Sequence, residues 1–172
     1  AVSWTDCIQG ALMFFAILAV PITAAMYLGG PIDTMQLIQS EFPQGLNLWG
    51  DTSDMFALVI GIISSLGWGL GYFGQPHILV RFMAISDAKE LKKSTNIAMV
   101  WVILSLLAAI FVGLIGHVYM LPEKLVGTDA ETIFLVMTER LFSPFMAGLI
   151  WSAVLAAIMS TASAQLLVTA SA

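Results

Sequence analysis

Two adjacent hydroxyl side chains, Ser160 and Thr161, lie in a long apolar stretch and could bind a hard cation. Such cations prefer oxygen ligands. A helix can offer two hydroxyls and a carbonyl from the preceding turn, here that of Ala157, without placing a charge in apolar surroundings. The same hydroxyls can instead donate to the carbonyl four residues earlier in their own helix. Both interpretations, a cation site and local hydrogen bonding, are open at this point.

A second unusual stretch, residues 67–77, combines low helix propensity with polar and aromatic side chains. It contains four glycines within eight residues, followed by Pro76, whose missing amide deprives the Tyr72 carbonyl of its usual partner. The glycines point in several directions, and among them lie four side chains able to contact a ligand: Trp68, Tyr72, Gln75 and His77. We expect a broken helix whose free backbone groups line a cavity, as in transporters.

Helix packing is the alternative for both stretches. Gly67 and Gly71 have the small-xxx-small spacing that lets two membrane helices approach closely. The segment that carries Ser160 and Thr161 also has a continuous stripe of small and polar residues on one face: Ser152, Ala153, Ala156, Ala157, Ser160, Thr161, Ser163, Gln165 and Thr169. Such stripes most often serve helix–helix contact.

The elements that must position these residues are membrane helices. The 172 residues are 59% hydrophobic and 10% charged, against about 45–50% and about 25% in soluble domains, which excludes a water-soluble globular protein. The charges leave gaps that each exceed the ~20 residues needed to cross a bilayer. The sequence therefore predicts an all-α integral membrane protein with four spans, at about 7–28, 55–80, 96–119 and 145–170.

The loops predict the orientation of these spans. Residues 81–93 carry a net charge of +2, whereas residues 33–54 and 123–140 carry −4 and −2. Because short cytoplasmic loops collect Lys and Arg, we place loop 81–93 inside and the acidic loops, 29–54 and 120–142, outside. The first outer loop contains a predicted short surface helix at 33–38. With no basic stripe, no nucleic-acid partner is expected.

The second outer loop contains an amphipathic pattern. Its apolar residues recur at helical spacing, opposite a polar face formed by Glu131, Thr138 and Glu139; the apolar set is Ile133, Phe134, Met137 and Leu141. The pattern predicts a short helix that lies either over the outer mouth of the protein or on the membrane surface.

Enzymatic chemistry has little support in the sequence. No span holds a carboxylate pair, a histidine cluster or a nucleophile beside a base. The single cysteine, Cys7, offers neither a disulfide nor a metal cluster. We expect a protein that is not an enzyme and needs no organic cofactor.

Three stretches together resemble the sodium/solute symporter family: Trp4 to Asp6 with Gln9, the run from Gly67 to Ala84, and Ala156 to Thr161 with Gln165 to Leu167. The glycine-rich run is most similar to that of the proline carriers of the family. The resemblance implies a ten-helix core of two inverted repeats. We interpret the chain as an internal fragment that supplies four of these helices, of which the second, 55–80, is discontinuous.

The resemblance also implies the roles of individual residues. The sodium ligands would be the Ala157 carbonyl and the Ser160 and Thr161 hydroxyls, and Asp6 would match an inner-end acid associated with sodium passage, although a helix cap also explains Asp6. The substrate-binding positions would be Trp68, Tyr72, Gln75, Pro76 and His77.

The activity implied is sodium-coupled import of a small organic solute, L-proline, across the cell inner membrane by alternating access. The expected partners are sodium, proline, the lipid bilayer and the remaining helices of the same chain. The alternative is a symporter-like sensory domain of a membrane histidine kinase. The sequence that follows residue 172 distinguishes the two, since a kinase core would follow in the second case.

Overall fold

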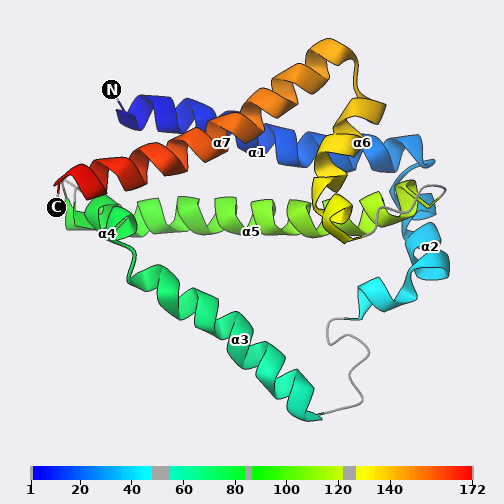
Figure 1. Ribbon diagram of the computed structural model, residues 1–172, viewed down its shortest axis with the longest axis horizontal. Helices are drawn as coiled ribbons and strands as arrows, with labels where there is room; N and C mark the ends of the chain where they lie inside the picture. Colours follow the sequence, from blue (N-terminus) through cyan, green and yellow to red (C-terminus); the bar gives the residue numbers. More distant parts are fainter. Residues whose placement is uncertain (1, 48–54, 84–86, 122–126, 172) are drawn as a thin grey trace.

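A computed structural model describes residues 2–47, 55–83, 87–121 and 127–171, and this part of the chain is helical with no strand (Figure 1). Its elements are α1 (Val2–Tyr27), α2 (Pro31–Glu41), η1 (Pro43–Leu46), α3 (Met55–Phe73), α4 (Pro76–Met83), α5 (Ala88–Tyr119), η2 (Gly127–Thr132), α6 (Ile133–Leu141) and α7 (Pro144–Ser171).

The prediction of an all-helical membrane protein is confirmed. Within the described ranges, four helices, α1, α3, α5 and α7, are long and apolar enough to cross a bilayer. α1 continues through Pro21, whose side chain is buried. Membrane helices tolerate such a proline because neighbouring groups satisfy the freed backbone carbonyl.

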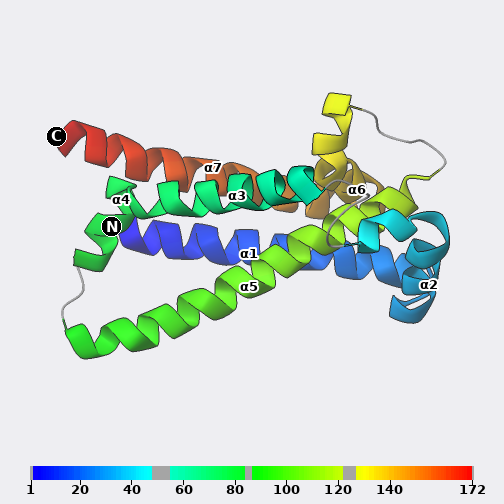
Figure 2. The same ribbon diagram turned by 90° about the horizontal axis from the view of Figure 1, so that it is seen from below.

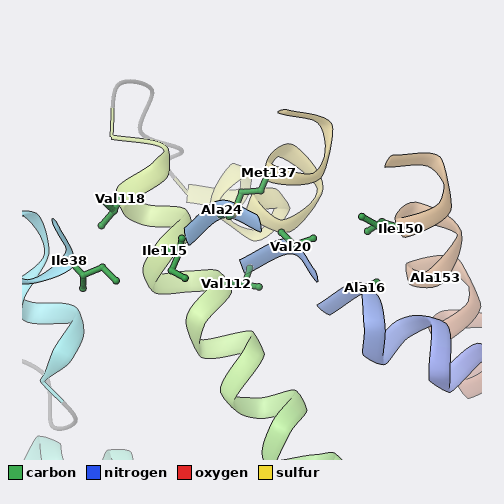
Figure 3. Packing of buried hydrophobic residues seen from close by; sticks show 10 residues of the cluster. All are labelled: Ala16, Val20, Ala24, Ile38, Val112, Ile115, Val118, Met137, Ile150 and Ala153. Atoms are coloured by element: carbon green, nitrogen blue, oxygen red, sulfur yellow. The ribbon is translucent and has the colours of Figure 1, made fainter. Parts of the chain in front are cut away.

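Three of the long helices pack together. α1 contacts both α5 and α7. α7 crosses α1 in Figure 1, and α1 runs between α7 and α5 in the view of Figure 2. Figure 3 shows the buried side chains where α2 and α6 join this bundle, and we name them the core cluster: Ala16, Val20, Ala24, Ile38, Val112, Ile115, Val118, Met137, Ile150 and Ala153. The packing is therefore concentrated at the end of the bundle assigned to the outside.

The turn between α1 and α2 follows from two glycines. Gly29 and Gly30 have φ values of +102° and +112°, which favour glycine, and they follow the end of α1, close to the predicted end of the first span at 28. α2 then starts at Pro31, and the buried Thr34 hydroxyl donates to the Gly30 carbonyl at 2.7 Å. The predicted short helix of the first loop is thus confirmed, with its inner face turned towards α5.

α6 lies across α1, α5 and α7 and corrects one sequence prediction. Met137 is fully buried, as the apolar pattern predicts. The placement of Thr138 on the polar face is wrong, because Thr138 is also fully buried. Its hydroxyl donates to the Phe134 carbonyl at 2.7 Å, so the helix itself satisfies the group and burial costs little.

α3 is arranged differently from the other long helices. It runs away from the bundle in Figure 1, and none of the described side chains in its apolar stretch Met55–Tyr72 is buried. α4 returns to the bundle and contacts α7. The chain therefore passes from an exposed helix, α3, to a short helix, α4, that contacts the helix carrying Ser160 and Thr161.

Candidate ion and substrate sites

The helix formed by the second apolar stretch is interrupted at Gly74 and Gln75, between the end of α3 and the start of α4. The amide of Gly74 donates to Gly71 at 3.2 Å and that of Gln75 to Tyr72 at 3.4 Å, so both bonds reach three residues back instead of four. Pro76 has no amide hydrogen to donate to the Tyr72 carbonyl. This carbonyl accepts a hydrogen bond from the Gln75 amide instead. A tightened turn thus replaces the regular ladder at this point.

The five predicted substrate residues lie on both sides of this interruption. Tyr72 is at the end of α3 with 49% of its surface exposed, and Gln75 and Pro76 are exposed at the start of α4. The backbones of Trp68 and His77 belong to α3 and α4, while their side chains lie outside the described part of the structure. The assignment of these five residues to substrate stays a prediction.

On α7, most hydroxyls bond within the helix. Thr161 donates to the Ala157 carbonyl at 3.1 Å, which is the local bond that the sequence left as an alternative. The two oxygens are also close enough to share one hard cation, since each would lie about 2.3–2.6 Å from it. The geometry is therefore compatible with both interpretations of this pair.

Ser160 makes a different contact. Its hydroxyl donates to the Asp6 carboxylate at 2.9 Å, which joins α7 to α1. Both residues are half-buried. The sequence contains no signal for this bond, because the two residues are 154 positions apart and only the packing of α7 against α1 brings them together.

A cavity of about 420 Å³ lies between α1, α5, α6 and α7, within the range typical of small-ligand pockets. Apolar side chains form most of its wall, including Met13, Ala16, Val112, Phe134, Ala153 and Ala157. Glu131 adds a carboxylate to this wall. The sequence pattern predicts Glu131 only as part of the polar face of the short helix in the second outer loop. Ala157 therefore takes part in both the cavity wall and the predicted ion site.

Acidic, cysteine and histidine ligands do not form a metal site in the described ranges, where no three such side chains gather. The candidate ion site consists of neutral oxygens, with a single carboxylate beside one of them. This donor set suits a monovalent hard cation better than a transition metal, which prefers nitrogen or sulfur ligands.

Comparisons with known proteins give consistent matches over the whole chain. The family model described as "Sodium:solute symporter family" matches residues 1–172. The chain is 50% identical over 99% of its length to the high-affinity proline transporter PutP of Bacillus subtilis strain 168. It is 48% identical over 100% to the osmoregulated proline transporter OpuE of the same strain.

A third relative, sodium/proline symporter 2 of Staphylococcus saprophyticus, is 46% identical over 99% of the chain. The chain spans about a third of the length of these curated relatives, with 35%, 34% and 32% of each covered. No solved structure matches the chain.

Proposed function

The chain belongs to the sodium:solute symporter family, and from this premise we propose that it is part of a sodium-coupled carrier that imports L-proline. Members of this family are transporters and not enzymes, and the four long apolar helices make this a multi-pass membrane protein. The observation that carries the proposal is the identity of 46–50% to proline transporters over 99–100% of the chain.

The interruption between α3 and α4 supports a substrate site at this point. In the proposed carrier, α3 and α4 form one discontinuous membrane segment within a ten-helix core of two inverted repeats. Broken helices present free backbone groups and helix ends to charged parts of a substrate near the middle of the bilayer. Trp68 and Tyr72 would contact the apolar ring of proline, and Gln75, Pro76 and His77 would complete this side of the pocket.

The sodium site would use the Ala157 carbonyl and the hydroxyls of Ser160 and Thr161, together with ligands from helices outside this chain. Sodium drives transport only if it binds one conformation better than another, since equal affinity shifts no equilibrium. One sodium ion moving down a membrane potential supplies ~2.3 kcal/mol per 100 mV, before any concentration gradient. A single sodium ion thus supplies enough free energy for the carrier to accumulate proline against its gradient by alternating access.

The charges of the loops give the proposed orientation in the cell inner membrane. The basic loop 81–93 would face the cytoplasm, and the acidic loops that contain α2 and α6 would face the outside. Asp6, near the start of α1, would then lie towards the cytoplasmic end of the bundle, where sodium leaves the carrier.

Uptake of labelled proline tests the proposal. Vesicles that contain the full-length protein should accumulate proline when sodium is high outside, and accumulation should collapse when the sodium gradient is removed. A potassium gradient of the same size serves as the control. Proline uptake that is indifferent to sodium, or no proline uptake at all, would contradict the proposed function.

A further inference from the structure

The first turns of α5 carry the largest concentration of positive charge in the described part of the chain. Lys89, Lys92 and Lys93 are exposed, and their i, i+3, i+4 spacing places them on one face of the helix, which we name the lysine face. α7 ends on the same side of the molecule in Figure 1 and has no basic residue in its last turn. The positive charge of this end is therefore concentrated on one helix.

Two acidic residues lie beside these lysines without neutralising them. The Asp87 carboxylate caps α5 by accepting from the backbone amide of Lys89 at 3.0 Å. Glu90 follows Lys89 by one position, which turns it about 100° around the helix and places it at the edge of the lysine face. Among the described residues, no carboxylate forms an ion pair with the three ammonium groups. The lysine face can therefore attract an anion from outside the protein.

This end of α5 stands apart from the helix bundle. Residues 89–100 are all exposed, and the N-terminal part of α5 diverges from α1 in the view of Figure 2. Trp101 is the first half-buried residue after this stretch, and its ring stacks on Phe14 of α1 with 4.2 Å between the ring centroids. The lysine face thus precedes the part of α5 that packs in the bundle.

The lysine face continues along α5 as a row of exposed apolar side chains. Asn96 is the last polar residue of the row, and Val100, Ile103 and Leu107 follow at helical spacing, with 58%, 51% and 46% of their surfaces exposed. The rise from residue 96 to residue 107 is about 16 Å, close to half of the ~30 Å hydrocarbon thickness of a bilayer. One face therefore combines three ammonium groups with an apolar strip as long as one lipid leaflet.

We propose that this face binds an anionic phospholipid, whose phosphate headgroup contacts the three lysines and whose acyl chain lies along Val100, Ile103 and Leu107. Lysine binds phosphate as a point charge, and its flexible stem lets the ammonium group reach the headgroup level. A zwitterionic lipid has no net charge to complement the lysines, so the site should prefer anionic lipids. Only the leaflet, here the inner one, rests on the proposed orientation.

Photo-crosslinking tests the proposed lipid site. The full-length protein is placed in phosphatidylcholine vesicles with a small fraction of phosphatidylglycerol that carries a photoreactive group on its acyl chain, and mass spectrometry identifies the labelled peptides. Labelling of residues 96–107 should be about tenfold higher than with photoreactive phosphatidylcholine of the same chain, because each lysine near the headgroups favours negative charge. The difference should decrease at ~1 M potassium chloride, which screens the charges.

Matched variants separate the charge of the lysines from other effects. Changing Lys89, Lys92 and Lys93 together to Gln should abolish the preference for phosphatidylglycerol, whereas changing all three to Arg should preserve it. Lys92→Gln alone should give a partial loss and serves if the triple Gln variant does not fold. Glu90→Gln should raise the preference about twofold, because it removes a negative charge at the edge of the lysine face.

Several results would overturn the inference. Equal labelling by the two lipids, or a preference unchanged in the triple Gln variant, would exclude recognition of the anionic headgroup. Labelling of residues 96–107 by neither lipid would show that another helix of the full-length protein covers this face. Loss of labelling on addition of inorganic phosphate would identify free phosphate, and not a lipid, as the ligand.

The crosslinking experiment is independent of the proposed function. It requires no transport, so a negative result leaves sodium-coupled proline uptake intact. Sodium-independent uptake by the unmodified protein would instead overturn the proposed function and leave the lipid site standing.

Discussion

α7 and α3 carry the two candidate sites, and they differ in how much of their surroundings this chain supplies. α7 packs against α1, with Ala153 only 1% exposed, and its ion-site hydroxyls have partners within the described residues. On α3, a Cβ added at Gly67, Gly69 or Gly71 would meet no atom within 4 Å among the residues that the structure describes. The helix of the proposed ion site is thus packed against another helix of this chain, whereas the glycines of the proposed substrate segment have no described neighbour here.

The physical reason lies in the side chains at the helix surfaces. Small residues on α7 allow α1 to approach closely, which gains dispersion contacts without a hydrophobic driving force. α3 presents large apolar side chains as well as glycines, and Leu66 and Leu70 are 63% and 75% exposed. We expect other helices of the full-length protein, or lipid, to cover them.

The largest effect is expected at Thr161, in the proposed ion site. Thr161→Ala removes one proposed sodium ligand and should raise the half-saturating sodium concentration about 30-fold, or about 2 kcal/mol, as expected for a polar contact to a charged group. Sodium-dependent uptake by the full-length protein measures this. Thr161→Ser should restore affinity. Thr169→Ala removes a hydroxyl that likewise donates to the carbonyl four residues earlier in α7, and it should not change the sodium affinity. Equal effects of the two alanine variants would contradict the assignment.

The next effect concerns the close packing of α6 on α5. A Cβ at Gly116 would lie 2.6 Å from Ile133 Cδ1 and 2.9 Å from Met137 Sδ. Compared with Gly113→Ala, Gly116→Ala should therefore lower the free energy of unfolding by about 1.5 kcal/mol, because the neighbours must shift while both alanines gain the same helix propensity. Thermal unfolding of the purified full-length protein measures the change. Gly113→Ala, where no atom lies within 4 Å, is the control; equal melting temperatures would show that α6 does not pack here.

A smaller effect is expected at Tyr72, in the proposed substrate segment. Tyr72→Leu should raise the proline concentration for half-maximal uptake about fivefold, since an aromatic contact contributes about 1 kcal/mol. Sodium half-saturation at saturating proline should hardly change. The same change at Phe56, at the far end of α3, should alter neither value. If Tyr72→Leu lowered the apparent affinity for sodium as much as the apparent affinity for proline, the proposed separation of the ion site from the substrate site would be wrong.

The smallest effect is expected at Gly69, in the bare part of α3. Gly69→Ala should raise the free energy of unfolding of the full-length protein by about 0.5 kcal/mol, because alanine has the higher helix propensity and no atom of the described residues lies within 4 Å of the added Cβ. Chemical or thermal unfolding checks the sign. Destabilisation instead would mean that a helix outside this chain packs against the glycines, which is the alternative that the sequence left open.

Local features of the fold could be predicted from the sequence. The four long apolar helices follow from the gaps between charges, and the end of α1 follows from Gly29 and Gly30. The helical spacing of apolar residues correctly predicted that Met137 is buried, but it wrongly placed Thr138 on the polar face. A periodic pattern counts a hydroxyl as polar, whereas inside a helix that hydroxyl is satisfied by the carbonyl four residues earlier.

The candidate sites could be predicted only in part. Ser160 and Thr161 stand out because hydroxyls in an apolar helix are chemically distinct, but the sequence could not tell a cation site from local bonding. The structure places Thr161 on its own helix carbonyl and Ser160 on Asp6. Two neighbouring hydroxyl side chains thus have different hydrogen-bond partners. The order of residues along the chain contains no information about which partner each one takes.

The sequence by itself determined which segments are apolar helices, because length, hydropathy and charge act locally along the chain. Only the tertiary structure decided that α1 and α7 meet through Asp6 and Ser160, that α6 packs against Gly116, and that α3 runs away from the bundle. These features depend on which helix surfaces fit together at close range, and that fit arises between residues far apart in the chain.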